Sequence, residues 1–267
     1  MIKLITAGGT KMEDYIEPIK WGILIFPLVA FLFTLPYAIN QYRKFGAIPL
    51  LRVLIVYSFI LYLICAYFLV ILPLPDKDTV ATLTTPTMQL QPLAFVDDFI
   101  TQTSLQINDP STYVKALTEP WFYQVVYNVL LVMPFGIYLR YYFKCSLVKT
   151  LLLSFLLSLF FELTQLSGLY GIYPRSYRLF DVDDLLINTF GGLIGFGLGG
   201  LFTKMLPTRD ELDNYAYEKG KKVSIWRRLL SFGLDIFFLI ILITSFMLIS
   251  FPHYTLWCIL LGFIIYF

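Results

Sequence analysis

Polar residues that could hold a ligand gather between residues 162 and 188 of an otherwise apolar chain. Glu162 and Gln165 stand near the end of one apolar run, and Arg175 and Arg178 follow in a short connection. Three carboxylates and an amide come next, at the start of the following apolar run: Asp181, Asp183, Asp184 and Asn188. Charged groups at the ends of apolar helices cost free energy unless they are paired, hydrated or functional. We therefore expect the functional site here.

These residue types suit two kinds of chemistry. The guanidinium groups of Arg175 and Arg178 can pair with Glu162, or can hold a phosphate or carboxylate of a ligand. Oxygen ligands without histidine suit Mg²⁺ or Ca²⁺ better than zinc, and a possible set is Glu162, Asp181 and Asp184. Alternatively, one carboxylate could act as a general acid or base. Binding and catalysis thus stay open, and so do a transporter and a purely structural cluster.

Spacing indicates which of these side chains share a face of a helix. Glu162 and Gln165 are three residues apart, and Asp184 and Asn188 are four apart, so each pair lies on one side of its helix. Asp183 has a simpler explanation. An aspartate at the start of a helix caps free amides and complements the helix dipole, and we expect this role for Asp183 ahead of ligand binding.

The composition predicts a helical membrane protein. Hydrophobic residues make up 58% of the chain and aromatic residues 18%, which is far from a soluble globular profile. Crossing a bilayer takes about 20 apolar residues. Six runs are that long: Trp21–Ile39, Leu51–Leu72, Trp121–Phe143, Leu147–Leu166, Leu185–Leu206 and Leu229–Ser250. We predict an all-α, polytopic transmembrane bundle of about six spans, followed by a short apolar helix at Thr255–Phe267. The expected partner is the lipid bilayer, with no nucleic acid.

Charge placement predicts the orientation. Thirteen of the 20 Lys and Arg residues fall at 40–52, 140–149 and 204–228, and such residues favour cytoplasmic connections. Residues 73–120, whose charged side chains are mainly acidic, and the polar cluster then lie outside the cell. Within that excursion, Leu93–Leu105 could form an amphipathic helix.

The chain divides, by this reading, into four parts. Residues 1–50 contain the first helix, 51–206 form a membrane domain, 207–222 form a polar cytoplasmic linker, and 223–267 form a separate segment. In the last span of the membrane domain, Gly191, Gly195 and Gly199 recur every four residues. No strand precedes them as a nucleotide site would require, so we expect a face for close helix packing.

The polar pattern resembles a known family. It consists of Asn128 followed by Pro134-Phe-Gly136, then Phe161-Glu162-x-x-Gln165, then Arg178-x-x-Asp181-x-x-Asp184-x-x-x-Asn188-x-x-Gly191. Over about residues 40–206 this is similar to the VanZ-like family. The resemblance implies a bacterial cell-membrane protein, mainly of Gram-positive bacteria, and the founding member is associated with low-level teicoplanin resistance. It implies no established reaction.

The function expected from this resemblance is a contribution to glycopeptide resistance or cell-envelope homeostasis. The ligand would be a lipid, a lipid-linked cell-wall precursor or a lipoglycopeptide, bound at the outer leaflet by the cluster together with Asn128. The alternatives are a membrane enzyme that acts on a lipid-linked phosphate with a divalent cation, and a transporter component. A second resemblance covers residues 223–267, where Trp226-Arg-Arg-Leu-Leu-Ser-Phe-Gly-Leu-Asp235 is similar to the start of an RDD domain without its later helices.

Overall fold

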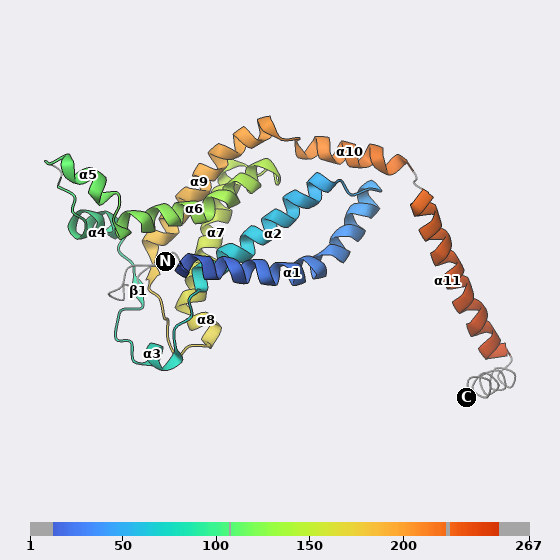
Figure 1. Cartoon of the computed structure of the whole chain (residues 1–267), viewed down its shortest axis with the longest axis horizontal. Helices are drawn as coiled ribbons and strands as arrows, with labels where there is room; N and C mark the ends of the chain where they lie inside the picture. The colour runs from blue at the N-terminus through green and yellow to red at the C-terminus, as the bar shows by residue number, and fades with distance from the viewer. Residues whose placement is uncertain (1–12, 107, 223–224, 251–267) are drawn as a thin grey trace. The chain divides into compact units, whose positions relative to one another are not determined.

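Long apolar helices dominate the computed structural model, which describes residues 13–106, 108–222 and 225–250. Five of the described helices are long and apolar enough to cross a membrane (Figure 1). They are α1 (Glu13–Phe45), α2 (Leu50–Ile71), α6 (Pro120–Tyr141), α7 (Leu147–Leu166) and α9 (Val182–Met205). The first five predicted spans are thereby confirmed, with small shifts at their ends. The protein is an all-α, multi-pass membrane protein.

The sixth predicted span is not confirmed at full length. Leu229–Ser250 lies in α11 (Ile225–Ser250), of which Phe232–Thr244 stands out as a shorter apolar helix. The short helix expected at Thr255–Phe267 lies outside the described residues.

Two compact units divide the chain, residues 1–216 and 217–267. In the first unit α9 packs against α6 and α7, and α1 packs against α2 (Figure 1). Successive spanning helices run in opposite directions, so α2 and α7 end where α6 and α9 begin. We call this the site end. The opposite end is where α1 meets α2, α6 meets α7, and α9 terminates.

Glycines bring α6 and α9 into backbone contact. A Cβ atom placed on Gly191 would lie 2.4 Å from the carbonyl oxygen of Val129, and one on Gly195 would lie 1.9 Å from that of Met133. On Gly199, the nearest atom would be the Cβ of Arg140, at 3.0 Å. Small residues permit this close approach of helices in lipid. A side chain at Gly191 or Gly195 would force the helices apart and would move the polar residues that they carry.

The excursion between α2 and α6 folds over the site end. It contains α3 (Lys77–Ala81), β1 (Met88–Gln89), α4 (Ala94–Gln102) and α5 (Ser111–Ala116). The short α8 (Gly168–Gly171) and β2 (Phe180–Asp181) precede α9. β1 and β2 pair in parallel, with Met88 beside Phe180 and Gln89 beside Asp181. The predicted helix at Leu93–Leu105 corresponds to α4, whereas the strand pairing had no signal in the sequence.

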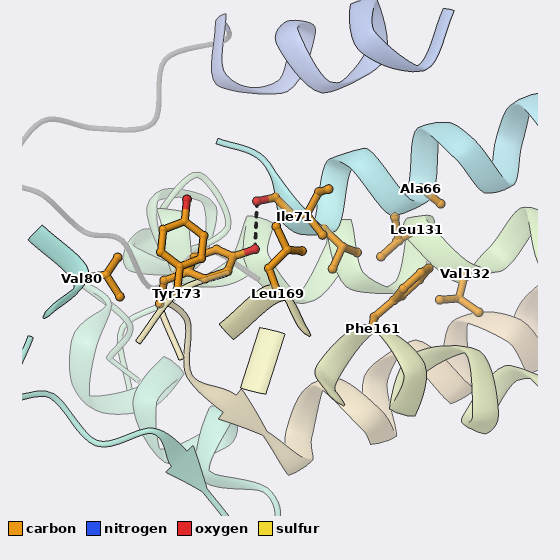
Figure 2. Close-up of a cluster of buried hydrophobic side chains, with 10 residues drawn as sticks. Ala66, Ile71, Val80, Leu131, Val132, Phe161, Leu169 and Tyr173 are labelled. Carbon is orange, nitrogen blue, oxygen red and sulfur yellow. Dashed lines mark hydrogen bonds between the residues drawn. The ribbon is translucent and has the colours of Figure 1, made fainter. Parts of the chain in front are cut away.

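A buried apolar cluster supports this end of the bundle. Its members come from α2, α6, α7 and the two connections: Ala66, Val70, Ile71, Val80, Leu131, Val132, Phe161, Leu169, Tyr173 and Tyr177. Figure 2 shows Val80 and Tyr173, from the connections, on the same side of the cluster, and Phe161 and Val132 between the helices. The excursion is therefore packed into the fold rather than tethered by its ends.

The segment predicted as a linker forms a helix, α10 (Arg209–Lys221). Glu211 Oε2 accepts from the Thr208 amide (2.8 Å), and Thr208 Oγ1 accepts from the Glu211 amide (3.3 Å). This reciprocal pair is a capping box, which starts a helix. Leu212 is buried with Tyr141 and Tyr142. The prediction of a polar linker overlooked the cap and the buried leucine, because the segment as a whole is charged.

Candidate functional site

Glu162 fixes the point where α9 begins. Its side chain lies near the end of α7 and is only 3% exposed, and its Oε2 atom accepts from the Asp181 amide at 3.0 Å. Asp181 is the N-cap of α9, and its Oδ1 atom accepts from the Asp183 amide at 2.9 Å. The two carboxylates thus satisfy amide groups that a helix start leaves unpaired.

Deeper in the bundle, a hydrogen-bonded network joins α6, α7 and α9. Asn128 Nδ2 donates to Asp184 Oδ1, and Asn188 Nδ2 donates to Ser158 Oγ at 2.9 Å. The Ser158 hydroxyl in turn donates to the carbonyl oxygen of Asp184 at 3.3 Å. All four residues are buried. The structure therefore brings together Asn128, Asp184 and Asn188, and adds Ser158.

Arg178 reaches the end of α2. Its Nη1 atom donates to the carbonyl oxygen of Val70 (2.8 Å) and its Nη2 atom to that of Leu72 (2.6 Å). Gln165 Nε2 also donates to Val70, at 2.9 Å. The last carbonyls of a helix lack partners within it and form the negative end of its dipole. Arg178 and Gln165 together stabilise the end of α2.

Two tyrosines continue this pattern along the chain that leaves α2. The Tyr177 hydroxyl donates to the carbonyl oxygen of Ile71 (3.1 Å; Figure 2), and the Tyr173 hydroxyl donates to that of Pro75 (2.9 Å). Burial raises the pKa of Tyr177, and the charge of Arg178 opposes that shift. Burial lowers the pKa of Arg178, and Tyr177 and the carboxylates of Glu162 and Asp184 oppose this. Arg178 therefore interacts electrostatically with the carboxylate cluster while it holds α2.

Arg175 does not make the contact expected of it. Its guanidinium group donates to the carbonyl oxygens of Leu83 and Thr85 in the excursion, rather than to Glu162. Those carbonyls lie in irregular chain, where no regular ladder of amides supplies donors. Arg175 thus ties the excursion to the connection between α7 and α9.

Asp183 caps a helix, but not its own. Its Oδ1 atom accepts from the Leu93 amide (2.6 Å) and its Oδ2 atom from the Phe95 amide (2.8 Å), at the start of α4. Leu93 has a left-handed backbone conformation (φ 65°) and offers no side-chain cap. The capping role expected at α9 belongs to Asp181, and the Asp183 carboxylate holds α4 over the site.

A small acidic pocket lies beneath α4. Its volume is about 20 Å³, and its walls include Phe95, Asp98, Trp121, Asp181, Asp183 and Asp184. This is room for one group the size of a water molecule. Of the predicted site residues, Asp181 and Asp184 line it. The arginines and Gln165 serve the backbone of other segments instead, so the predicted residues divide between a pocket and its supports.

Comparison of the sequence with family profiles gives a match to VanZ/LLP1 over residues 59–203. This protein belongs to the VanZ/LLP1 family. The matched region runs from α2 to α9 and contains the pocket, the network and the excursion. Comparisons with curated proteins and with solved structures give no match. Because the family match ends at residue 203, the resemblance of residues 223–267 to an RDD domain stays a prediction.

Metal binding in the VanZ/LLP1 domain gains no support from the side-chain geometry. Among the residues that the structure describes, no three His, Cys, Asp or Glu side chains are grouped so that they could hold an ion. Glu162 and Asp181 accept from backbone amides, and Asp184 accepts from Asn128. Binding of Mg²⁺ or Ca²⁺ by these three carboxylates stays a prediction.

The sequence analysis missed a line of buried polar side chains along α7 of the VanZ/LLP1 domain. Thr150, Ser154, Ser158 and Glu162 recur every four residues and are all buried. The signal was the repeat itself, because residues four apart share a helix face. A Cβ atom on Gly192 would lie 2.1 Å from Ser154 Oγ. The line is therefore packed against α9 at Ser154.

Proposed function

We propose that this VanZ/LLP1 protein binds an amine-bearing lipid or lipoglycopeptide of the bacterial cell envelope. The protonated amine enters the acidic pocket beneath α4. Through this binding the protein contributes to envelope homeostasis and to tolerance of teicoplanin-type glycopeptides. The observation that carries the proposal is the pocket itself, whose walls include Asp98, Asp181, Asp183 and Asp184.

Charge and size both favour an ammonium group. Carboxylates attract a cation, and the ring of Trp121 in the same wall can add a cation–π contact. An anionic headgroup would face like charges. The two arginines that would otherwise hold a phosphate, Arg175 and Arg178, donate to backbone carbonyls. A lipid-linked phosphate, as substrate or ligand, is therefore the less favoured alternative.

The proposed orientation places the pocket at the outer leaflet. Basic residues cluster at the opposite end, including Arg43, Arg52, Lys144, Lys149 and Lys204. Such residues are retained on the cytoplasmic side. A transporter would need an open polar route between the two sides, and the close packing of Ser154 on Gly192 does not favour one.

The experiment compares neighbouring carboxylates on α4. Asp98 lines the pocket, whereas Asp97 is exposed. Purified full chain in detergent is titrated with phosphatidylethanolamine, and with its N-acetyl derivative, which keeps the phosphate and lacks the ammonium charge. The rise in melting temperature with lipid concentration gives the apparent affinity. We expect Asp98→Asn to weaken the affinity for the aminolipid about tenfold, which corresponds to the loss of one charge contact (about 1.4 kcal/mol). Asp97→Asn should bind as the wild type does.

Teicoplanin susceptibility of a Gram-positive host that expresses the same variants gives the cellular measurement. Asp98→Asn should lose the tolerance that the wild type and Asp97→Asn confer, at equal membrane abundance. Equal stabilisation by the aminolipid and its N-acetyl derivative would contradict the proposal.

A further inference from the structure

Two amide oxygens are buried without a partner where α6, α7 and α9 meet. The side chains of Asn128 and Asn188 are 1% and 3% exposed, and within the described chain neither Oδ1 atom has a hydrogen-bond partner. Buried polar atoms are nearly always satisfied by protein, water or an ion. The two oxygens therefore indicate a bound partner that is not one of the surrounding side chains. We call this partner the occupant.

The network fixes which end of each amide is available. Asn128 donates through Nδ2 to the Oδ1 atom of Asp184. Asn188 donates through Nδ2 to Ser158 Oγ, whose own proton goes to the carbonyl of Asp184. Turning the Asn128 amide around would set its oxygen against the Asp184 carboxylate oxygen. Turning the Asn188 amide around would require the Ser158 hydroxyl to leave the carbonyl of Asp184. The occupant must therefore donate hydrogen bonds or carry positive charge.

The depth of the two asparagines limits what the occupant can be. Asn128 lies eight residues after Pro120, the start of α6, and Asn188 lies six after Val182, the start of α9. These separations correspond to about 12 and 9 Å along the helices. Lipid offers no hydrogen-bonding groups within the hydrocarbon region. The protein itself must supply the ligands, and its groups here are all oxygens.

We propose that Asn128, Ser158, Asp184 and Asn188 form a binding site for one Na⁺ ion. Amide and hydroxyl oxygens with one carboxylate suit a hard monovalent cation, whereas Mg²⁺ would keep several waters that this buried place does not offer. Polar side chains of this kind within transmembrane helices commonly mark ion sites. The ion would join α6, α7 and α9 at the base of the acidic pocket.

This inference goes beyond amine binding and is separable from it. Asp184 belongs to both sites, but Asn128, Ser158 and Asn188 are not part of the pocket wall, and Asp98 is not part of the network. Loss of amine binding in Asp98→Asn and loss of Na⁺ binding in Asn188→Leu can therefore occur independently.

The test is thermal melting of the purified full chain in NaCl, KCl and choline chloride at one ionic strength. We expect the melting temperature to rise with Na⁺ in a saturable manner, and not with choline. Asn188→Leu should weaken the apparent Na⁺ affinity at least tenfold. Thr189→Val is the matched control, because the Thr189 hydroxyl bonds to Leu185 within its own helix, and it should respond to Na⁺ as the wild type does.

Saturable retention of ²²Na⁺ by the purified wild type gives a second measurement, which does not depend on the folding of a variant. A Na⁺ response kept in Asn188→Leu, or melting that is equal in the three salts, overturns the proposal and would indicate a buried water instead. Absence of saturable ²²Na⁺ retention overturns it as well.

Discussion

The two ends of the helical bundle hold charged side chains in different ways. At the site end, Arg178 and Asp183 bond to backbone carbonyls and amides of segments far along the chain. At the opposite end, Arg140 donates to the backbone carbonyl of Phe196 at 2.8 Å, whereas two other basic residues meet side chains. Arg52 pairs with Asp213 and also donates to Gln41 at 2.6 Å, and Lys144 pairs with Asp210.

The difference bears on how each end tolerates change. A backbone carbonyl at the end of a helix is fixed in place, so only a side chain of the right length and shape can serve it. A carboxylate on a flexible side chain can follow a shifted partner. We therefore expect the site end to depend on the exact side chain and the opposite end to depend mainly on charge.

The largest effect is expected from exchanging arginine for lysine at both ends. Lysine keeps the charge but offers one compact donor group instead of a planar fork. In Arg178→Lys one of the carbonyls of Val70 and Leu72 loses its donor, and we expect a loss of about 2–3 kcal/mol in the free energy of unfolding. In Arg52→Lys the new ammonium can still meet Asp213, and the flexible Gln41 side chain can follow it, so the loss should be about 1 kcal/mol. Melting of both variants in detergent measures the contrast.

Equal losses at the two positions would remove the distinction between the ends. A larger loss in Arg52→Lys than in Arg178→Lys would reverse it. Melting of Arg209→Lys provides the baseline for a half-buried arginine of the opposite end, because Arg209 lies over the ring of Tyr142 at 5.6 Å and the structure gives it no ion pair among the described residues.

A smaller, local effect is expected from Asp183→Asn. The amide keeps one acceptor oxygen, so either the Leu93 or the Phe95 amide loses its partner, at a cost of about 1 kcal/mol. Because α4 is held by these bonds, hydrogen exchange at residues 93–96 should accelerate while exchange in α7 and α9 stays as in the wild type. Asp97→Asn, on the exposed face of α4, should leave exchange unchanged. Uniform acceleration throughout the bundle would mean that Asp183 supports the fold globally.

The smallest effect concerns the ion pairs of α10. A double-mutant cycle on Lys144 and Asp210, both exposed, should give a coupling energy below about 0.5 kcal/mol that disappears at high ionic strength. The same cycle on Arg52 and Asp213 should give about 1–3 kcal/mol with weaker screening, since the Arg52 side chain is buried. Choline chloride serves as the salt, so that Na⁺ binding does not contribute. Two equally salt-sensitive couplings would contradict the assignment of Arg52 to a buried pair.

Apolar runs predicted the five spans because crossing a bilayer demands a length and a composition that few other structures share. Spacing was similarly informative for Asp184 and Asn188, which share a face of α9 and join one network. Spacing of this kind shows which residues share a face within one helix. It does not predict which segment of the chain packs against that face.

The partners of the arginines show where that limit lies. Every residue has a carbonyl oxygen, so no letter in the sequence marks Leu83 or Thr85 as the acceptor for Arg175. Two other features could be detected in the sequence but were not used in the prediction. Thr208 and Glu211 have the spacing of a capping box, and Thr150, Ser154 and Ser158 repeat every four residues. The capping box was overlooked because the segment around it is charged, and the repeat was overlooked because the rest of α7 is mostly apolar.

The contacts of the excursion also set an order for the making of the protein. Residues 83–95 meet their partners, Arg175, β2 and Asp183, only across some ninety residues of sequence. A ribosome releases the excursion well before those partners exist. The excursion therefore cannot cover the pocket until the α7–α9 hairpin has been inserted. Membrane insertion of the last hairpin of the family domain is thus the step that completes the site, and a chain halted before α9 would carry Arg175 and Arg178 but would lack Asp183 and Asp184.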